Sequence, residues 1–184
     1  MLEVQTLETQ RLLLKGVTPE IIHQLFQKCS KTEMISFFGT DESGYQRYQL
    51  MHEKGMTTYN QSLYFFVLVD KESQQAIGEC GFHTWNFTHR RAELFYNIHE
   101  QANRGKGLMK EALAKIINFG FKELQLHRIQ ALIAECNTAS LRLLLHYNFT
   151  KEGVLREDYW VNQLHEDSVC YSLLASEWKK NNCL

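Results

Sequence analysis

The segment from Arg104 to Met109 constrains the fold of this chain more than any other, because it joins a strand-like run to a helix-like run. The strand-like run covers 92–98 and the helix-like run covers 107–124. The first amides of a helix lack internal partners, and the helix dipole is positive at that end. Glycine also lets the backbone approach a phosphate closely. The sequence therefore predicts an anion site at this helix start, where Arg104 and Lys106 add positive charge.

Two familiar nucleotide motifs do not account for this segment. The dinucleotide fingerprint requires a third glycine, and the nucleoside-triphosphate loop requires Ser or Thr directly after Gly-Lys. A second strand-to-helix turn follows about thirty residues later, where the run 129–136 leads into Asn137-Thr138-Ala139-Ser140 and then a helix-like run, 141–147. Two such turns in succession favour a ligand site over an ordinary loop.

Together these segments resemble the GNAT superfamily of acetyl-CoA-dependent N-acetyltransferases. The pyrophosphate loop of that family reads Arg/Gln-x-x-Gly-x-Gly/Ala, and Arg104, Gly107 and Met109 fill its fixed places. Met109 departs from the small residue usual at the last place. The second family motif is an Asn-x-x-Ser helix followed by a Gly-Phe pair, and here that pair is Asn148-Phe149. Asparagine is the next-best residue after glycine for a left-handed helix end.

Three further segments resemble the RimJ/RimL-like branch, whose members acetylate ribosomal proteins. They are the opening Thr9-Gln10-Arg11-Leu12-Leu13-Leu14, the run Ala92-Glu93-Leu94-Phe95-Tyr96, and the closing run 167–174. The resemblance covers nearly the whole chain in order, which implies a single domain over 1–184. It also implies an α/β fold of the GNAT type, a mixed and strongly twisted central sheet with helices on both faces and a splayed strand pair that holds the cofactor.

Hydrophobic periodicity independently predicts alternating strands and helices. A helix is expected after Thr18, which can cap it, with Pro19 in the first turn, and a second helix is expected over 41–58. The Gly107 helix carries apolar residues at helical spacing, so it should pack on a sheet. The predicted strands are 12–17, 63–69, 76–83, 92–98, 128–136, 149–161 and 167–174.

Composition limits the classes of protein to which the chain can belong. The 184 residues include 44% hydrophobic and 22% charged residues, with a formal net charge of -1, so no global field favours nucleic acid. No apolar run is long enough to span a membrane, and the start of the chain does not read as a signal peptide. The five cysteines, an odd number without a Cys-x-x-Cys pair, argue against a disulfide framework or a structural zinc site: Cys29, Cys80, Cys136, Cys170 and Cys183. A cytoplasmic location is therefore expected.

The resemblance implies a set of residues that bind acetyl-CoA. Backbone groups of Phe95, Tyr96, Asn97 and Ile98 should hold the pantetheine arm as a pseudo-strand, although plain sheet pairing is the alternative interpretation of this run. The residues expected to bind the pyrophosphate are Arg104, Gly105, Lys106, Gly107, Leu108 and Met109. Asn137 and Ser140 complete the set, and both are also ordinary helix-start residues. No metal is expected, because none of the eight histidines, including His83 and His89 around a predicted turn, has helical ligand spacing.

Acetyl transfer to an amine also requires groups that move protons. Many family members protonate the thiolate with a tyrosine one turn beyond the serine, where this chain has Leu144, and Tyr147 matches poorly. The serine is the proposed acid in the RimJ/RimL-like branch, which implies Ser140. For the base we expect Glu93, with Glu157 and its neighbour Asp158 as further candidates on a later strand. A solvated or salt-bridged carboxylate is the alternative interpretation of each, and water is the alternative route for the proton.

The expected activity is transfer of acetyl from acetyl-CoA to a primary amine by direct attack in a ternary complex. The resemblance to the RimJ/RimL-like branch implies that the default acceptor is a protein N-terminal amine, as on ribosomal proteins. Polyamines, amino acids and aminoglycosides are alternatives, and so is a CoA-binding module without turnover. No nucleic acid or membrane partner is expected, and the sequence leaves a homodimer open.

Overall fold

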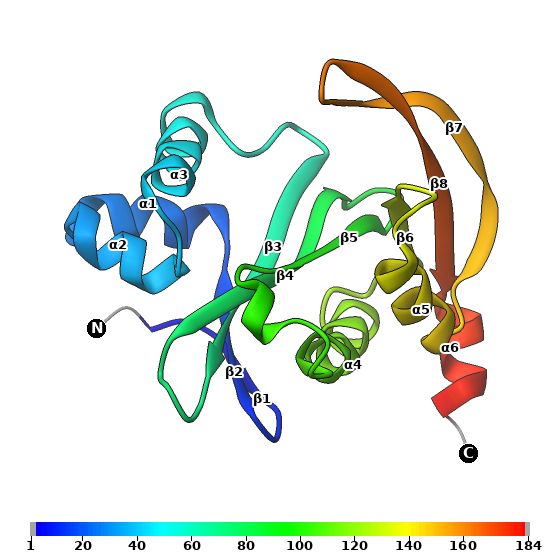
Figure 1. The fold of residues 1–184 in the computed structure, drawn as a ribbon, viewed down its shortest axis with the longest axis horizontal. Coiled ribbons are helices and arrows are strands. Elements are labelled where there is room, and N and C mark those ends of the chain that lie inside the picture. Colours follow the sequence, from blue (N-terminus) through cyan, green and yellow to red (C-terminus); the bar gives the residue numbers. More distant parts are fainter. Residues whose placement is uncertain (1–2, 183–184) are drawn as a thin grey trace.

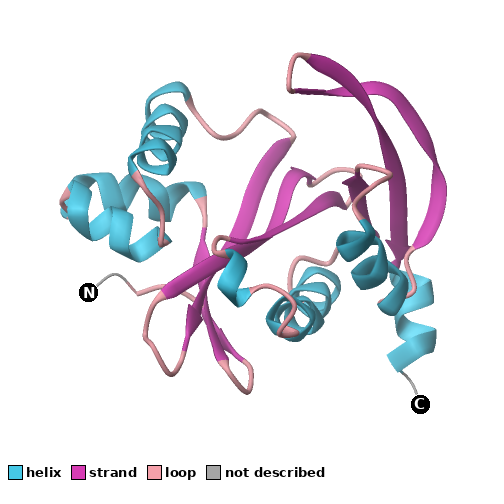
Figure 2. Cartoon of the chain, viewed as in Figure 1, coloured by secondary structure: helices cyan, strands magenta, loops and turns pink. Residues whose placement is uncertain are grey.

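In the computed structural model, which describes residues 3–182, the chain forms one eight-stranded sheet with helices packed against it (Figure 1, Figure 2). The strands are β1 (Thr6–Glu8), β2 (Leu12–Val17), β3 (Gln61–Asp70), β4 (Ala76–Asn86), β5 (Arg91–Ile98), β6 (Arg128–Ile133), β7 (Thr150–Val161) and β8 (Leu164–Leu174). The helices are α1 (Pro19–Lys28), α2 (Lys31–Phe38), α3 (Glu42–Lys54), α4 (Leu108–Lys122), α5 (Thr138–His146) and α6 (Ala175–Asn182), with a short 3-10 helix, η1 (Gln101–Asn103).

The strands lie in the order β1-β2-β3-β4-β5-β6-β8-β7, and β5 and β6 form the parallel pair in an otherwise antiparallel sheet. Pairing between β5 and β6 extends only from Arg91–Arg128 to Glu93–Gln130. Beyond that point the two strands diverge, while β5 stays paired with β4 as far as Ile98. The second half of β5 therefore has one edge that no described strand covers.

Helices cover both faces of the sheet because alternate residues of each strand point to opposite faces. Phe66 and Leu68 of β3 belong to the core beneath α4 and α5. Phe65 and Val67 of the same strand belong to the core beneath α1, α2 and α3. The predicted fold class, a mixed sheet with helices on both faces and a splayed strand pair, is confirmed in these respects (Figure 1).

The predicted first helix begins as expected. Thr18 lies at the N-cap of α1 and accepts a hydrogen bond from the amide of Ile21 at 3.4 Å, and Pro19 opens the first turn. The next helix, α2, was not predicted, although Ser30 and Glu33 form a capping box that marks its start. Neither β1 nor α6 was predicted.

Several predicted boundaries are wrong. The strand expected over 76–83 continues to Asn86, and the strand expected over 167–174 begins at Leu164. The helix expected over 41–58 ends at Lys54, because Gly55 leaves the helical region with a φ of 91°. Asp41 precedes the helix as its cap and accepts a hydrogen bond from the amide of Gly44 at 3.0 Å. The strand expected over 128–136 ends at Ile133, since the chain turns there toward α5.

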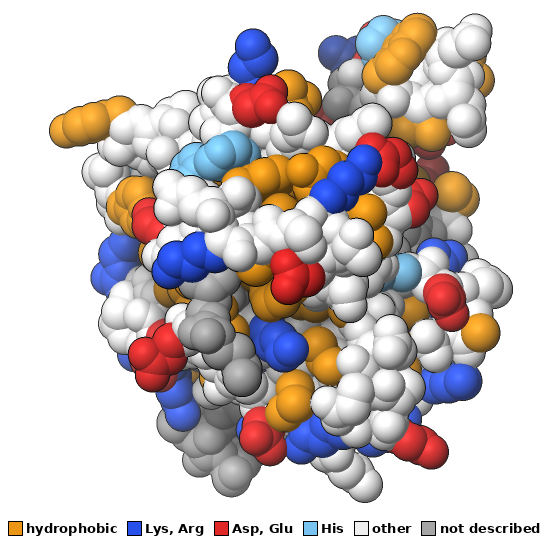
Figure 3. Space-filling model, turned by 90° about the vertical axis from the view of Figure 1, so that its left-hand side faces the viewer, with side chains coloured by type: hydrophobic (Ala, Val, Ile, Leu, Met, Phe, Trp, Pro, Cys, Tyr) orange, Lys and Arg blue, Asp and Glu red, His pale blue; other side chains and the backbone are white. Residues whose placement is uncertain are grey.

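Side chains of both charge signs are interspersed over the face formed by α1 to α3 (Figure 3). None of the helices within residues 3–182 is long and apolar enough to cross a membrane. Four cysteines are free thiols, Cys29, Cys80, Cys136 and Cys170, whereas Cys183 lies outside the described residues.

Candidate active site

A hollow of about 170 Å³ lies where β5 and β6 separate. Side chains from β4, β5, α5 and β7 meet there, although these elements are far apart in sequence. Its lining includes His83, Glu93, Phe95, Tyr96, Asn137, Ser140 and Tyr159. The structure thus gathers Glu93, Phe95 and Tyr96 of β5 with Asn137 and Ser140 around one hollow, whereas Asn97 and Ile98 are not in its lining.

The glycine-rich turn lies at the start of α4. Gly105 and Gly107 adopt φ values of 74° and 78°, in the left-handed region that favours glycine, and Gly107 is the N-cap of the helix. Within residues 3–182, no side chain caps the first amides of α4, and a Cβ at Gly105 would have no neighbour within 4 Å. Leu108 and Met109 are buried and fix the helix to the core. The turn therefore has the geometry of an anion site.

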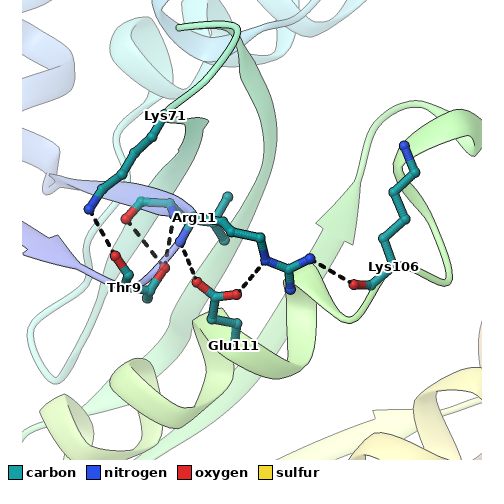
Figure 4. Close-up of polar contacts among 6 residues, drawn as sticks. Thr9, Arg11, Lys71, Lys106 and Glu111 are labelled. Carbon is teal, nitrogen blue, oxygen red and sulfur yellow. Dashed lines mark hydrogen bonds and ion pairs between the residues drawn. The ribbon is translucent and has the colours of Figure 1, made fainter.

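Arg11, which belongs to the opening motif of the chain, bonds both the glycine-rich turn and α4 (Figure 4). The backbone amide and Nε of Arg11 donate to the two carboxylate oxygens of Glu111 at 2.7 and 2.8 Å, and a terminal nitrogen donates to the carbonyl oxygen of Lys106 at 3.0 Å. Burial raises the pKa of Glu111, but hydrogen bonds from Thr9 and Arg11 outweigh that effect and lower it overall. The carboxylate stays ionised and keeps the turn tied to α4.

The Arg104 side chain is engaged within its own loop. Its Nε and one terminal nitrogen donate to the carbonyl oxygen of Ile98 at 3.1 and 2.9 Å, and the other terminal nitrogen donates to Gln101. Arg104 therefore closes the loop onto the end of β5. Lys106 is exposed and directs its side chain away from Arg11 (Figure 4).

Asn137 and Ser140 open α5 beside the hollow. The Asn137 side chain accepts a hydrogen bond from the amide of Ser140 at 3.1 Å, so Asn137 is a cap. The Tyr96 hydroxyl faces this region and is buried without a hydrogen-bond partner in residues 3–182. Burial raises the Tyr96 pKa, and the nearby Ser140 hydroxyl opposes that shift without forming a hydrogen bond of ordinary geometry. Because buried polar groups usually have a hydrogen-bond partner, this unpartnered hydroxyl indicates that a ligand binds beside it.

Leu144 and Tyr147 do not contribute to the hollow. Leu144 is buried in the core. The Tyr147 hydroxyl donates to the carbonyl oxygen of Lys110, and burial raises its pKa to about 12. Two other tyrosines line the hollow, Tyr96 and Tyr159. The sequence predicted only a backbone role for Tyr96.

Glu93 lies in the hollow with His83 and Tyr159. Its side chain is 13% exposed, and one oxygen lies 3.6 Å from Nε2 of His83. Its other oxygen accepts a hydrogen bond from Gln130 at 3.5 Å. Burial raises the pKa of Tyr159, and the negative charge of Glu93 adds to that effect. The sequence offered His83 only as a rejected metal ligand. The register shift between β4 and β5 that positions it, between His83 and Asn86, leaves no signal in the pattern of residues.

Glu157 lies apart from this group. It is exposed on β7 at a register shift, with a φ of 54°, and its backbone amide donates to Asp167 at 2.8 Å. Tyr159, two residues later, is the β7 side chain that lines the hollow. The structure therefore brings Glu93 and Ser140 together but not Glu157.

Among residues 3–182, no group of three His, Cys, Asp or Glu side chains is placed to hold a metal ion. The expectation of a metal-free reaction stays a prediction.

Comparisons with known proteins point to one family of enzymes. A family model described as an acetyltransferase (GNAT) domain matches residues 11–150. An uncharacterized N-acetyltransferase of Bacillus subtilis, YoaA, is 32% identical over 170 residues, which cover 91% of this chain and 96% of that protein. A ribosomal protein uS5 alanine N-acetyltransferase of Escherichia coli is 30% identical over 118 residues, which cover 64% of this chain and 60% of that protein. A spermidine N-acetyltransferase of Vibrio cholerae, solved as a dodecamer, has a TM-score of 0.69 at 21% identity and covers 94% of this chain and 98% of its own.

Proposed function

This chain belongs to the GNAT family, whose members are acetyl-CoA-dependent N-acetyltransferases, and we propose that its acceptor is a protein N-terminal amine. The amine attacks the thioester directly while both substrates are bound. The observation that carries the proposal is the hollow between the diverging strands β5 and β6, which collects Glu93, Tyr96 and Ser140 next to the uncovered edge of β5.

The residues present fit acetyl-CoA as the acetyl donor. The amides at the start of α4, with Gly105 and Gly107, suit the pyrophosphate. The backbone of 95–98, on the uncovered edge of β5, suits the amide groups of the pantetheine arm. The Tyr96 hydroxyl, which has no partner in residues 3–182, and the Ser140 hydroxyl suit the thioester end. Acetyl-CoA supplies the activated acetyl group, and these residues hold it.

A second hollow, of about 380 Å³, supports the choice of acceptor. It adjoins the first hollow at His83, which lines both. Hydroxyl and amide side chains contribute to its lining, together with one cationic side chain: Lys54, Thr57, Thr58, Gln61 and Ser62. Among the described residues that line it, none is acidic. Such a surface suits the polar backbone of a peptide and repels an amine that carries several positive charges.

Spermidine is the main alternative acceptor, because a structural neighbour carries that name. At 21% identity that neighbour shows the fold alone. A polyamine site needs carboxylates to balance two or more charges, and the second hollow offers Lys54 instead. The structure therefore supports a peptide acceptor more than a polyamine. Amino acids and aminoglycosides are the remaining alternative acceptors, and the assay described next includes them.

The test is release of free thiol from acetyl-CoA with a panel of amines. The panel contains peptides with free N-termini, the same peptides blocked at the N-terminus, spermidine, free amino acids and an aminoglycoside. We expect turnover with free-N-terminal peptides and none with the blocked ones, and mass spectrometry should place the acetyl group on the α-amine. Faster turnover with spermidine would overturn the proposed acceptor, and no turnover with any amine would favour a CoA-binding role.

A homodimer stays a prediction. Light scattering coupled to size-exclusion chromatography measures the mass directly, against 21.7 kDa for one chain.

A further inference from the structure

His83 lies where the two hollows meet. It lines the hollow between β5 and β6, and it also lines the hollow beside the end of α3. Its side chain is 42% exposed, so it can reach a ligand on either side. An acceptor amine that enters through the second hollow passes this imidazole before it reaches the thioester.

A shift in the register between β4 and β5 sets the direction of the His83 side chain. Pairing between β4 and β5 is regular as far as His83–Glu93, then shifts and resumes at Asn86–Arg91. Within the shift, Thr84 has a φ of 51°, which is a genuine outlier for a β-branched residue. Bulges next to active sites turn a side chain away from its regular direction, and strained residues cluster at such sites.

Three contacts then fix the ring. Nδ1 of His83 lies 2.9 Å from the Thr84 hydroxyl oxygen. The ring stacks on Phe95, with 5.4 Å between centroids and 28° between planes. Nε2 lies 3.6 Å from a carboxylate oxygen of Glu93. In the tautomer that carries the proton on Nδ1, this nitrogen donates to the Thr84 hydroxyl oxygen and Nε2 presents a lone pair.

We propose that His83 is the base that removes a proton from the acceptor ammonium, and that Glu93 acts through it by stabilising the imidazolium. This proposal rests on the proposed function, since it concerns the amine of the same reaction. Glu93 is then a positioning residue instead of the base expected from the sequence. Imidazole suits the task, because it is the side chain that ordinarily changes charge between pH 5 and 8.

The protons balance over the reaction. Nε2 of His83 takes one proton from the ammonium, and the neutral amine nitrogen bonds to the thioester carbonyl carbon. The tetrahedral adduct collapses, the carbon–sulfur bond breaks, and the second proton of the nitrogen passes to the departing thiolate. The imidazolium then releases its proton to solvent. The net result is an amide, a free thiol and one proton.

The charged and titratable groups around His83 are consistent with this role. Glu93 faces it from β5 and stabilises the positive ring. Tyr159 of β7 lines the same hollow, and its raised pKa keeps it neutral near pH 7. Lys54, from the end of α3, lines the second hollow and repels an additional cation there.

The experiment compares His83→Gln and His83→Ala with the control His89→Gln, an exposed histidine that lines neither hollow. We expect both His83 variants to lose about 100-fold or more of kcat/KM for the amine near pH 7, within the range for a general base. Higher pH should partly restore the activity of both, and added imidazole should partly restore that of His83→Ala. Acetyl-CoA affinity, measured by calorimetry, and the activity of His89→Gln should not change.

Two results would overturn the proposal. One is a His83→Gln variant with the activity and pH profile of the unchanged protein. The other is a loss that neither higher pH nor imidazole relieves. If the unchanged protein does not acetylate peptides, the proposed acceptor fails instead, and the same variants are measured with the amine that the panel identifies.

Discussion

Nε of Arg11 lies 2.8 Å from a carboxylate oxygen of Glu111, although the two residues are 100 positions apart in the chain. The contact joins the loop before β2 to the first turn of α4. Because Arg11 also bonds the carbonyl oxygen of Lys106, it ties the glycine-rich turn to the first turn of α4. A preorganised turn binds an anion without the entropic cost of ordering it.

Arg11→Lys should therefore weaken acetyl-CoA binding without unfolding the protein. Lysine keeps the charge but cannot bond Glu111 and the Lys106 carbonyl together in the fork geometry of arginine. We expect about a tenfold loss of affinity by calorimetry, about 1.4 kcal/mol. Arg90→Lys is the matched control, because the Arg90 guanidinium bonds the carbonyl of Gln125 instead of the turn. Equal affinity in both variants would show that Arg11 does not position the turn.

Gly107→Val tests the anion site itself. A Cβ at this position would meet only Arg11, at 3.7 Å, so the free protein has room for it, whereas the positive φ disfavours a β-branched residue. We expect acetyl-CoA affinity to fall at least about tenfold, or about 1.4 kcal/mol. Gly153→Val is the control, because Gly153 also has open space around it and does not have a positive φ. A folded Gly107→Val variant with normal affinity would contradict the assignment.

The parts of this protein that sequence patterns predict are those where a local rule decides the structure. The Gly107 helix start follows from glycine and an apolar stripe, and the cap at Thr18 follows from its hydroxyl and Pro19. The contacts that complete the site are not local. The Arg11–Glu111 bond spans most of the chain, and the position of His83 depends on a register shift between two strands. No periodicity encodes either, so the sequence pointed to Glu93 but not to the position of His83 beside it.

Ser140→Ala separates a proton-relay role from a helix-start role. The change removes the hydroxyl and leaves the Asn137 side chain to accept from the backbone amide of residue 140, so α5 should remain capped. We expect kcat to fall more than KM for acetyl-CoA rises. Steady-state kinetics with a good acceptor provide the measurement. Normal turnover would show that Ser140 serves only the helix.

The variant Tyr96→Phe tests the role of the Tyr96 hydroxyl through two measurements, the melting temperature and the turnover rate. The Tyr96 hydroxyl is buried without a partner in residues 3–182, so its removal relieves an unsatisfied polar group. The melting temperature of the free protein should therefore stay the same or rise. Turnover should fall, since the hydroxyl faces Ser140 in the hollow and stays protonated at neutral pH through its raised pKa. A lower melting temperature with unchanged turnover would show a purely structural hydroxyl.

The two carboxylates that the sequence offered as bases differ in their surroundings, so Glu93→Gln and Glu157→Gln should differ in effect. Glu93 is largely buried next to His83, whereas Glu157 is exposed on β7. Glu93→Gln removes the negative charge that favours the imidazolium, and it should lower kcat/KM for the amine at neutral pH by less than His83→Gln does. Raising the pH should partly restore it, because the acceptor then supplies its own neutral form. Glu157→Gln should have the smaller effect. A pH–rate profile of both variants decides between them: if Glu157→Gln is the impaired one, the hairpin of β7 and β8 supplies the base, and if neither is impaired, the carboxylates take no part in removing the proton.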